Sequence, residues 1–175
     1  MAGIDCLDAE ACADNLRCLD DEMKRAGIPF WLSEGTALGV RRERAFIPHD
    51  DDVDVAVREG FRKAFMRDVL PRLEKRGFVV AKVWNQGHFI TLFRKEALDI
   101  DFVEEGRSCM FLTRGKEMGF RGSCKSLEQF LANLNTISFL GRRFVIPGDD
   151  YYQYMYGEDW QTPNRSSTCP RRSIR

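Results

Sequence analysis

Four aspartates lie within five positions of this chain, at Asp50, Asp51, Asp52 and Asp54. Carboxylates this close repel one another unless they are solvated or share a cation, so the cluster predicts an exposed loop or a metal site. From Asp52 onward acids alternate with valines, which is the period of a strand buried on one face. Asp52 and Asp54 would then project from the same face, where one divalent cation could bind both. We expect Asp50 and Asp51 to be solvated loop residues.

The composition indicates an enzyme-sized soluble domain. A length of 175 residues corresponds to about one domain with a core of its own. Lys and Arg together number 27, as do Asp and Glu, which argues against a nucleic-acid partner. No segment has the pattern of a signal peptide or a membrane span, so we expect a cytoplasmic protein without membrane insertion. An anchor upstream in a longer native chain would instead place the site in a secretory compartment.

The six cysteines lack the spacing of a zinc site, and we expect them to be reduced thiols. Hydrophobic periodicity and turn residues predict an α+β fold. The expected helices are residues 8–26, 61–77 with a bend near Pro71, 125–134 and 149–156, together with a short helix after Gly35 and Thr36. The expected strands are residues 28–33, a strand from Asp52, 78–84, 88–94, 97–103 and two short strands within 137–147.

A second pair of acids, Asp99 and Asp101, alternates with apolar residues in the strand predicted at 97–103. If that strand pairs with the strand from Asp52, three inward carboxylates could converge and hold one or two Mg²⁺ ions against a phosphate. Phosphoryl transfer needs such positioning and charge compensation, and a carboxylate that accepts a hydroxyl proton. The pattern therefore indicates phosphoryl-transfer chemistry.

A glycine turn precedes the acidic strand. Gly35 would let backbone amides approach a phosphate, and the helix that follows offers unpaired N–H donors at its first turn. Thr36 could add a hydroxyl, and arginines at positions 41, 42 and 44 could grip a diphosphate.

The segment Gly-Thr-x-Leu-Gly-x-x-Arg from Gly35 to Arg42, followed by Phe-Ile-Pro-x-Asp-Asp-Asp-x-Asp from Phe46 to Asp54, resembles the LicD family. This family includes the fukutin-related proteins and has the nucleotidyltransferase fold of the polymerase-beta type. Residues 139–147 and 156–163 resemble its closing motifs. The resemblance implies a single α+β domain over residues 1–163, with a nucleotidyltransferase-like mixed β-sheet flanked by helices. We expect residues 164–175 to form a disordered tail.

The resemblance also implies residue roles. Asp52 and Asp54 match the family's metal-binding pair, and Asp101 matches its third carboxylate, a metal ligand or general base. Gly35, Thr36 and Arg42 match the nucleotide-side motif. The implied cofactor is Mg²⁺ or Mn²⁺. The implied partners are a CDP-alcohol donor, such as CDP-choline or CDP-ribitol, and a glycan acceptor, with CMP released.

Departures and alternatives remain open. His49 and Ala45 stand where the family commonly has Trp and Gly, which leaves the donor open. Asp99, outside the family match, is interpreted as a polar residue at the sheet edge. The tyrosines at 151, 152, 154 and 156 are interpreted as a packed helix rather than a choline cage. The alternative functions are NMP transfer from an NTP to a small molecule, and non-catalytic binding of a nucleotide or glycan.

Overall fold

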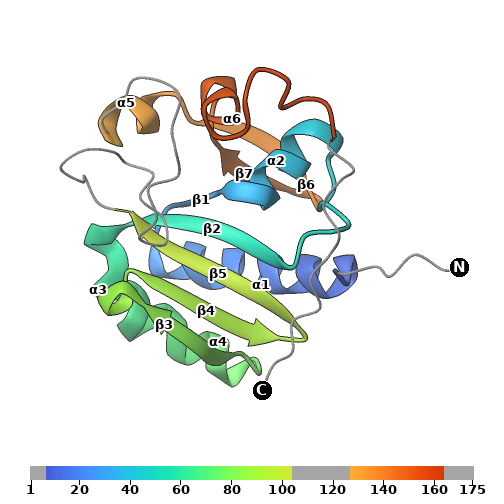
Figure 1. The fold of residues 1–175 in the computed structure, drawn as a ribbon. Coiled ribbons are helices and arrows are strands. Elements are labelled where there is room, and N and C mark those ends of the chain that lie inside the picture. Colours follow the sequence, from blue (N-terminus) through green and yellow to red (C-terminus); the bar gives the residue numbers. More distant parts are fainter. Residues whose placement is uncertain (1–6, 104–126, 164–175) are drawn as a thin grey trace, which may run out of the picture.

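The computed structural model describes residues 7–103 and 127–163, and its centre is a five-stranded mixed sheet (Figure 1). The strand order is β1-β2-β5-β4-β3. Strands β2 and β5 pair in parallel, whereas the other neighbours are antiparallel. Helices flank the sheet, which confirms the predicted α+β class. The strand bounds are β1 Phe30–Leu32, β2 Asp52–Arg58, β3 Val79–Trp84, β4 Phe89–Arg94 and β5 Glu96–Val103.

The parallel pair β2 and β5 carries the acids. Asp54 lies opposite Asp99, and Ala56 lies opposite Asp101. The expectation that Asp99 occupies the sheet edge was wrong, because β5 lies between β2 and β4. Strands β3 and β4 precede β5 in sequence but lie on its outer side, where they form an antiparallel pair. As a result β5 is an inner strand of the sheet.

One face of the sheet is covered by α1 (Ala9–Ala26) and by the helical segment that ends in α4 (Leu70–Lys75), as Figure 1 shows. The Asp8 carboxylate accepts hydrogen bonds from two amides of the first turn of α1, both at 3.0 Å. Gly27 ends the helix in the left-handed region, at φ 67°, which a residue with a side chain rarely adopts. The predicted helix at 8–26 is therefore confirmed.

The predicted helix at 61–77 is a series of shorter segments. A 3₁₀ turn (Glu59–Phe61), α3 (Arg62–Ala64), a π-helical segment (Phe65–Val69) and α4 follow one another. Pro71 has no N–H and its ring clashes with the carbonyl four residues earlier, so the regular ladder cannot pass through it. The widened π turn directly before α4 accommodates the proline.

The remaining elements lie beyond the β1 edge of the sheet, around α2 (Glu34–Glu43), as Figure 1 shows. They are α5 (Leu127–Ala132), β6 (Asn135–Phe139), β7 (Arg142–Ile146) and α6 (Asp149–Tyr156). Strands β6 and β7 form the predicted hairpin. Its turn residues Leu140 and Gly141 both have positive φ, 52° and 72°, as a tight hairpin turn requires. Tyr152 stacks on Trp160 with ring centroids 4.9 Å apart, so the start of α6 is packed in the core.

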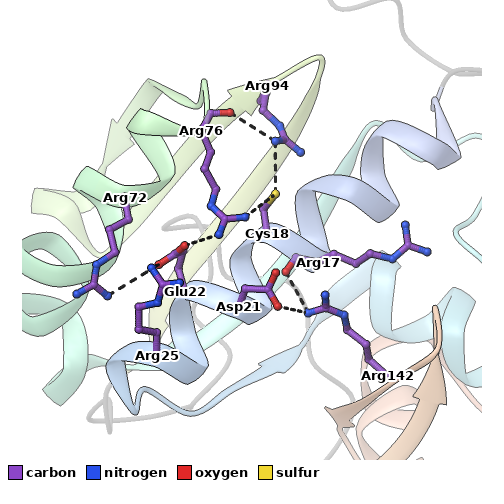
Figure 2. Close-up of polar contacts among 9 residues, drawn as sticks. All are labelled: Arg17, Cys18, Asp21, Glu22, Arg25, Arg72, Arg76, Arg94 and Arg142. Carbon is purple, nitrogen blue, oxygen red and sulfur yellow. Dashed lines mark hydrogen bonds and ion pairs between the residues drawn. The ribbon is translucent and has the colours of Figure 1, made fainter.

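An ion-pair network joins α1 to α4 and to β7 (Figure 2). Glu22 of α1 is only 1% exposed, and Arg76 Nη2 lies 2.8 Å from its Oε1. Arg25 and Arg72 lie 3.4 and 3.9 Å from its Oε2. Arg142 of β7 donates to the carboxylates of residues 20 and 21. These contacts fix α4 and β7 against α1.

Within the described residues, Cys12 and Cys18 are free thiols. The cysteines at 6, 109, 124 and 169 and the tail predicted at 164–175 lie outside those residues. Among residues 7–103 and 127–163, no helix combines the length and the apolar character that crossing a bilayer requires.

Candidate active site

Three buried carboxylates meet on the sheet face toward α2. Asp52, Asp54 and Asp99 each have a carboxylate oxygen within 4.8 Å of the others, and none is more than 6% exposed. Asp101 is partly buried, two residues further along β5, and is not part of this group. The structure thus brings Asp52 and Asp54 together with Asp99, while Asp101, which the resemblance gave as the third carboxylate, lies outside this group.

A second acidic group shares Asp52. One carboxylate oxygen each of Asp50, Asp51 and Asp52 lies within the same 4.8 Å limit. Asp50 and Asp51 lie in the loop before β2, as predicted, and are partly buried, so they are less solvated than we expected. This loop brings the Asp50 carboxylate against Gly35, at the start of α2.

The close packing of these acids raises their proton affinity. Burial raises the pKa of Asp54 well above its usual range, and the charges of Asp52, Glu34, Asp50 and Asp99 raise it further. The pKa of Asp50 is raised to about 6, again mainly by burial. A divalent cation would relieve this repulsion, and a ligand set made of carboxylate oxygens fits hard cations such as Mg²⁺ or Mn²⁺.

Two hydrogen bonds from the start of α2 hold the backbone of Asp54. The Asp54 amide donates to Thr36 Oγ1 at 2.9 Å, and the Ser33 amide donates to the Asp54 carbonyl at 3.1 Å. Thr36 is buried, so its hydroxyl acts on Asp54. The structure therefore places Thr36 beside the carboxylates as a residue that positions one of them.

Gly35 lies directly against Asp50. A Cβ atom at position 35 would lie 2.1 Å from Asp50 Oδ2, which no real side chain tolerates. The glycine is thus required by the close approach of the Asp50 carboxylate to the first turn of α2. The sequence predicted an approach of the backbone to a phosphate at this position, and the structure shows an approach to an acidic side chain.

Arg42 lies in the last turn of α2, whereas Thr36 lies in the first. It is six residues from Thr36, about 9 Å along the axis of α2. Its Nη1 donates to the Trp160 carbonyl oxygen at 3.4 Å. Neighbouring Arg41 makes a two-bond ion pair with Asp149, at 2.8 and 2.9 Å. In this structure both arginines tie α2 to the C-terminal part of the fold.

The sequence did not predict that Glu34 and the hydroxyl groups of Tyr151 and Tyr156 lie near the site. The Glu34 amide donates to Tyr151 Oη at 3.1 Å, and Glu34 has φ 42°, a strained value for a residue with a side chain. Burial raises the pKa of Tyr156, and the charges of Asp54, Glu34 and Asp50 raise it further, which places this phenol near the acids. Tyr156 is 38% exposed, so it also faces solvent. The one signal for Glu34 in the sequence was its position directly before Gly35.

Solved structures show the same fold. The lincosamide antibiotic adenylyltransferase LnuA, in its lincomycin-bound crystal structure, aligns with a TM-score of 0.56 over 83% of this chain and 86% of that chain, at 13% identity. The solution structure of the antibiotic-resistance factor ANT(2'')-Ia aligns with a TM-score of 0.51 over 79% and 66%, also at 13% identity. At this identity the likeness establishes the nucleotidyltransferase-like fold.

The family model described as LicD/FKTN/FKRP, nucleotidyltransferase domain, matches residues 27–149, more than half of the chain. The chain belongs to this LicD family. The matched range contains β1 to β5, α2 and the whole carboxylate group. The resemblance in the motifs around Gly35 and Asp54 is thereby confirmed at the level of the family.

Curated relatives match over shorter ranges. The uncharacterized protein RP689 of Rickettsia prowazekii is 27% identical over 93 residues, which are 52% of this chain and 32% of that protein. Ribitol-5-phosphate transferase FKTN is 36% identical in Mus musculus and 34% in Homo sapiens, over 55 residues. Those residues are 31% of this chain and 11% of FKTN. The match thus spans a third or less of these relatives.

Proposed function

We propose that this LicD-family domain moves a phospho-alcohol, of the phosphocholine or phosphoribitol type, from a CDP-alcohol to a carbohydrate hydroxyl. The observation that carries the proposal is the buried Asp52, Asp54 and Asp99 group beside the first turn of α2. Family membership and the name of the FKTN relatives, ribitol-5-phosphate transferase, support a phospho-alcohol as the transferred group.

The three carboxylates would hold Mg²⁺ or Mn²⁺. When bound, such a cation neutralises charge on the donor's phosphate oxygens. Thr36 keeps Asp54 in place through its amide, and Gly35 gives the acidic loop access to the start of α2. We assign Arg42 to the support of α2, through the Trp160 carbonyl, rather than to the donor.

The reaction needs one further group, a base for the acceptor. The acceptor oxygen attacks the phosphorus that carries the alcohol, and the bond from that phosphorus to the oxygen of CMP breaks. The hydroxyl proton leaves to a carboxylate, and we assign this role to Asp101. It lies two residues from Asp99 on the same face of β5 and outside the three-carboxylate group, and a carboxylate is a suitable proton acceptor for a hydroxyl.

The experiment is chromatography of CMP released from CDP-choline, CDP-ethanolamine, CDP-glycerol and CDP-ribitol, with Mg²⁺, Mn²⁺ or EDTA. Release into water serves as the readout without an acceptor. We expect metal-dependent release from one donor, and none from Asp54→Asn, whose folding is checked by circular dichroism. Near-normal release by Asp54→Asn would overturn the assignment.

A second candidate is NMP transfer from an NTP to a small molecule. The family description, a nucleotidyltransferase domain, favours keeping it. Labelled NTPs replace the CDP-alcohols in the same assay, and pyrophosphate is the product measured. Pyrophosphate release without CMP release would establish this activity. Nucleotide binding by calorimetry with neither product would indicate a non-catalytic relative.

A further inference from the structure

A row of side chains leads from the candidate active site to the outer edge of the sheet. Asp101 of β5 lies opposite Phe89 of β4, and Phe89 lies opposite Trp84 of β3. Residues in register project from the same face of a sheet, and Asp101 is two residues from Asp99. Phe89 and Trp84 therefore share the face that carries the carboxylates. With about 4.8 Å between strands, Trp84 stands about 10 Å from β5.

The neighbouring row on this face is polar. Asp99 lies opposite Thr91 of β4, and Thr91 lies opposite Lys82 of β3. The Lys82 ammonium lies 5.9 Å from the centroid of the Trp84 ring. The outer end of the face thus combines an indole ring with a cation, and Asp101 adds an acid from β5.

Trp84 is the exposed tryptophan of this chain. It is 56% exposed, whereas Trp31 and Trp160 are buried in the core. Tryptophan is highly buried on average, so an indole exposed near the candidate active site indicates a ligand-binding surface. Its flat ring is apolar with a negative face, which suits the C–H groups on one side of a sugar ring. Sugar hydroxyls accept hydrogen bonds from an ammonium and donate them to a carboxylate.

We propose that Trp84, Lys82 and Asp101 form the binding surface for the carbohydrate acceptor. A sugar ring stacks on Trp84, and its hydroxyls bond to Lys82 and Asp101. The opposite charges of these two side chains balance, which fits an uncharged polyhydroxylated ligand. This inference rests on the proposed function, because it places the acceptor on the Asp101 side of the reacting phosphate.

A second copy of the chain is the competing occupant, because β3 is an exposed edge strand. Two features disfavour strand pairing there. Lys82 lies in the middle of the strand, and the pairing with β4 is irregular between Val80 and Lys82. Val83, which is 58% exposed, lies opposite Ile90 on the other face and provides a matched control.

Acrylamide quenching of tryptophan fluorescence tests the surface, because the exposed Trp84 dominates the accessible signal. The probes are cellobiose, lactose and chitobiose, with glycerol as a hydroxyl control that lacks a ring. We expect disaccharides to reduce quenching in the wild type and in Val83→Ala, glycerol to have no effect, and Trp84→Phe to lose the protection. Protection by none of the three sugars overturns the proposal. Protection that instead grows with protein concentration, without sugar, also overturns it and indicates a second copy.

The transfer assay separates this inference from the proposed function. With a donor that supports CMP release into water, that release is measured without sugar as the baseline for the wild type, Trp84→Ala and Val83→Ala. The disaccharide concentration for half-maximal stimulation should rise on the order of tenfold in Trp84→Ala and stay unchanged in Val83→Ala. Equal concentrations in Trp84→Ala and wild type contradict the proposal. If no donor releases CMP, the proposed function fails while the fluorescence result still reports on Trp84.

Discussion

The amide of Asp54 donates a 2.9 Å hydrogen bond to the hydroxyl oxygen of Thr36, and both residues are buried. The Asp54 carbonyl accepts a bond from Ser33, so the start of α2 satisfies both backbone polar groups of this acid. The site acid is therefore fixed by its backbone as well as by the strand that carries it. Thr36 is a positioning residue in this arrangement.

Thr36→Val should destabilise the protein and slow CMP release, because it leaves the buried Asp54 amide without an acceptor. The expected loss in the free energy of unfolding is about 1–3 kcal/mol. Thr36→Ser keeps the hydroxyl and should restore most of the CMP release. Urea unfolding and the CMP assay measure the two effects. If the Val and Ser variants release CMP equally fast, the hydrogen bond does not position Asp54.

Gly35→Ala should displace the Asp50 carboxylate, since the new Cβ would lie 2.1 Å from Asp50 Oδ2. Overpacking of this kind costs about 1–3 kcal/mol in the free energy of unfolding. Asp50→Gly removes the obstacle, so the double variant should be less destabilised than the sum of the two single variants. Urea unfolding of all four proteins measures the coupling. Additive effects would show that the two residues do not conflict.

Without a metal ion, the free energy of unfolding should fall as the pH rises through about 6. The pKa of Asp50 is raised to about 6 and that of Asp54 is raised as well, whereas both are near 3.9 in the unfolded chain. The folded protein then binds more protons, and the stability that protonation contributes is present below pH 4 and lost through pH 6. For Asp50, which is partly exposed, we expect about 1–2 kcal/mol.

Urea unfolding in EDTA, at about pH 5 and about pH 7.5, measures this change. Asp50→Asn and Asp54→Asn should each reduce the difference between the two pH values. Mg²⁺ should stabilise the wild type more at the higher pH, because protons compete with the cation for the same oxygens. A pH difference unaffected by either substitution would place its origin outside this site.

Glu22→Gln should lower the free energy of unfolding. At a temperature where the variant is folded, its rate of CMP release should equal that of the wild type. The buried Glu22 carboxylate faces Arg25, Arg72 and Arg76, as Figure 2 shows, and its loss leaves three like charges close together. Those arginines are 37–61% exposed and solvent screens them, so we expect about 1–3 kcal/mol in urea unfolding. Asp14→Asn, which removes an exposed ion pair, is the control and should cost about 0–0.5 kcal/mol. Equal losses in the two variants would contradict the structural role of the network.

The predictable parts of the fold are those with a local cause. Asp8 and Gly27 mark the ends of α1 through their capping chemistry, and the alternation from Asp52 marks β2. The order of the strands has no such local signal. Strands β3 and β4 precede β5 in sequence but lie outside it, so the inner position of Asp99 followed only from the structure.

The site shows the same division. Alternation placed Asp99 and Asp101 on one face of β5, but their register against Asp54 depends on pairing between distant strands. The motif also contains Arg42, and its positive charge suggested a phosphate contact. In the structure Arg42 lies at the opposite end of α2 from Thr36 and donates to the Trp160 carbonyl. Glu34 was missed because a positive φ in a non-glycine residue cannot be read from the sequence.

The last prediction separates the roles of Asp99 and Asp101. Asp99 lies within the three-carboxylate group and Asp101 lies outside it, so Asp99→Asn should raise the Mg²⁺ concentration for half-maximal CMP release on the order of tenfold to a hundredfold. Asp101→Asn should keep the Mg²⁺ dependence and lower the transfer rate on the order of a hundredfold, because it removes the general base. Thr91→Val, opposite Asp99 on β4, is the control for packing. The reverse pattern, with Mg²⁺ dependence weakened in Asp101→Asn alone, would make Asp101 the third ligand, as the motif resemblance implied.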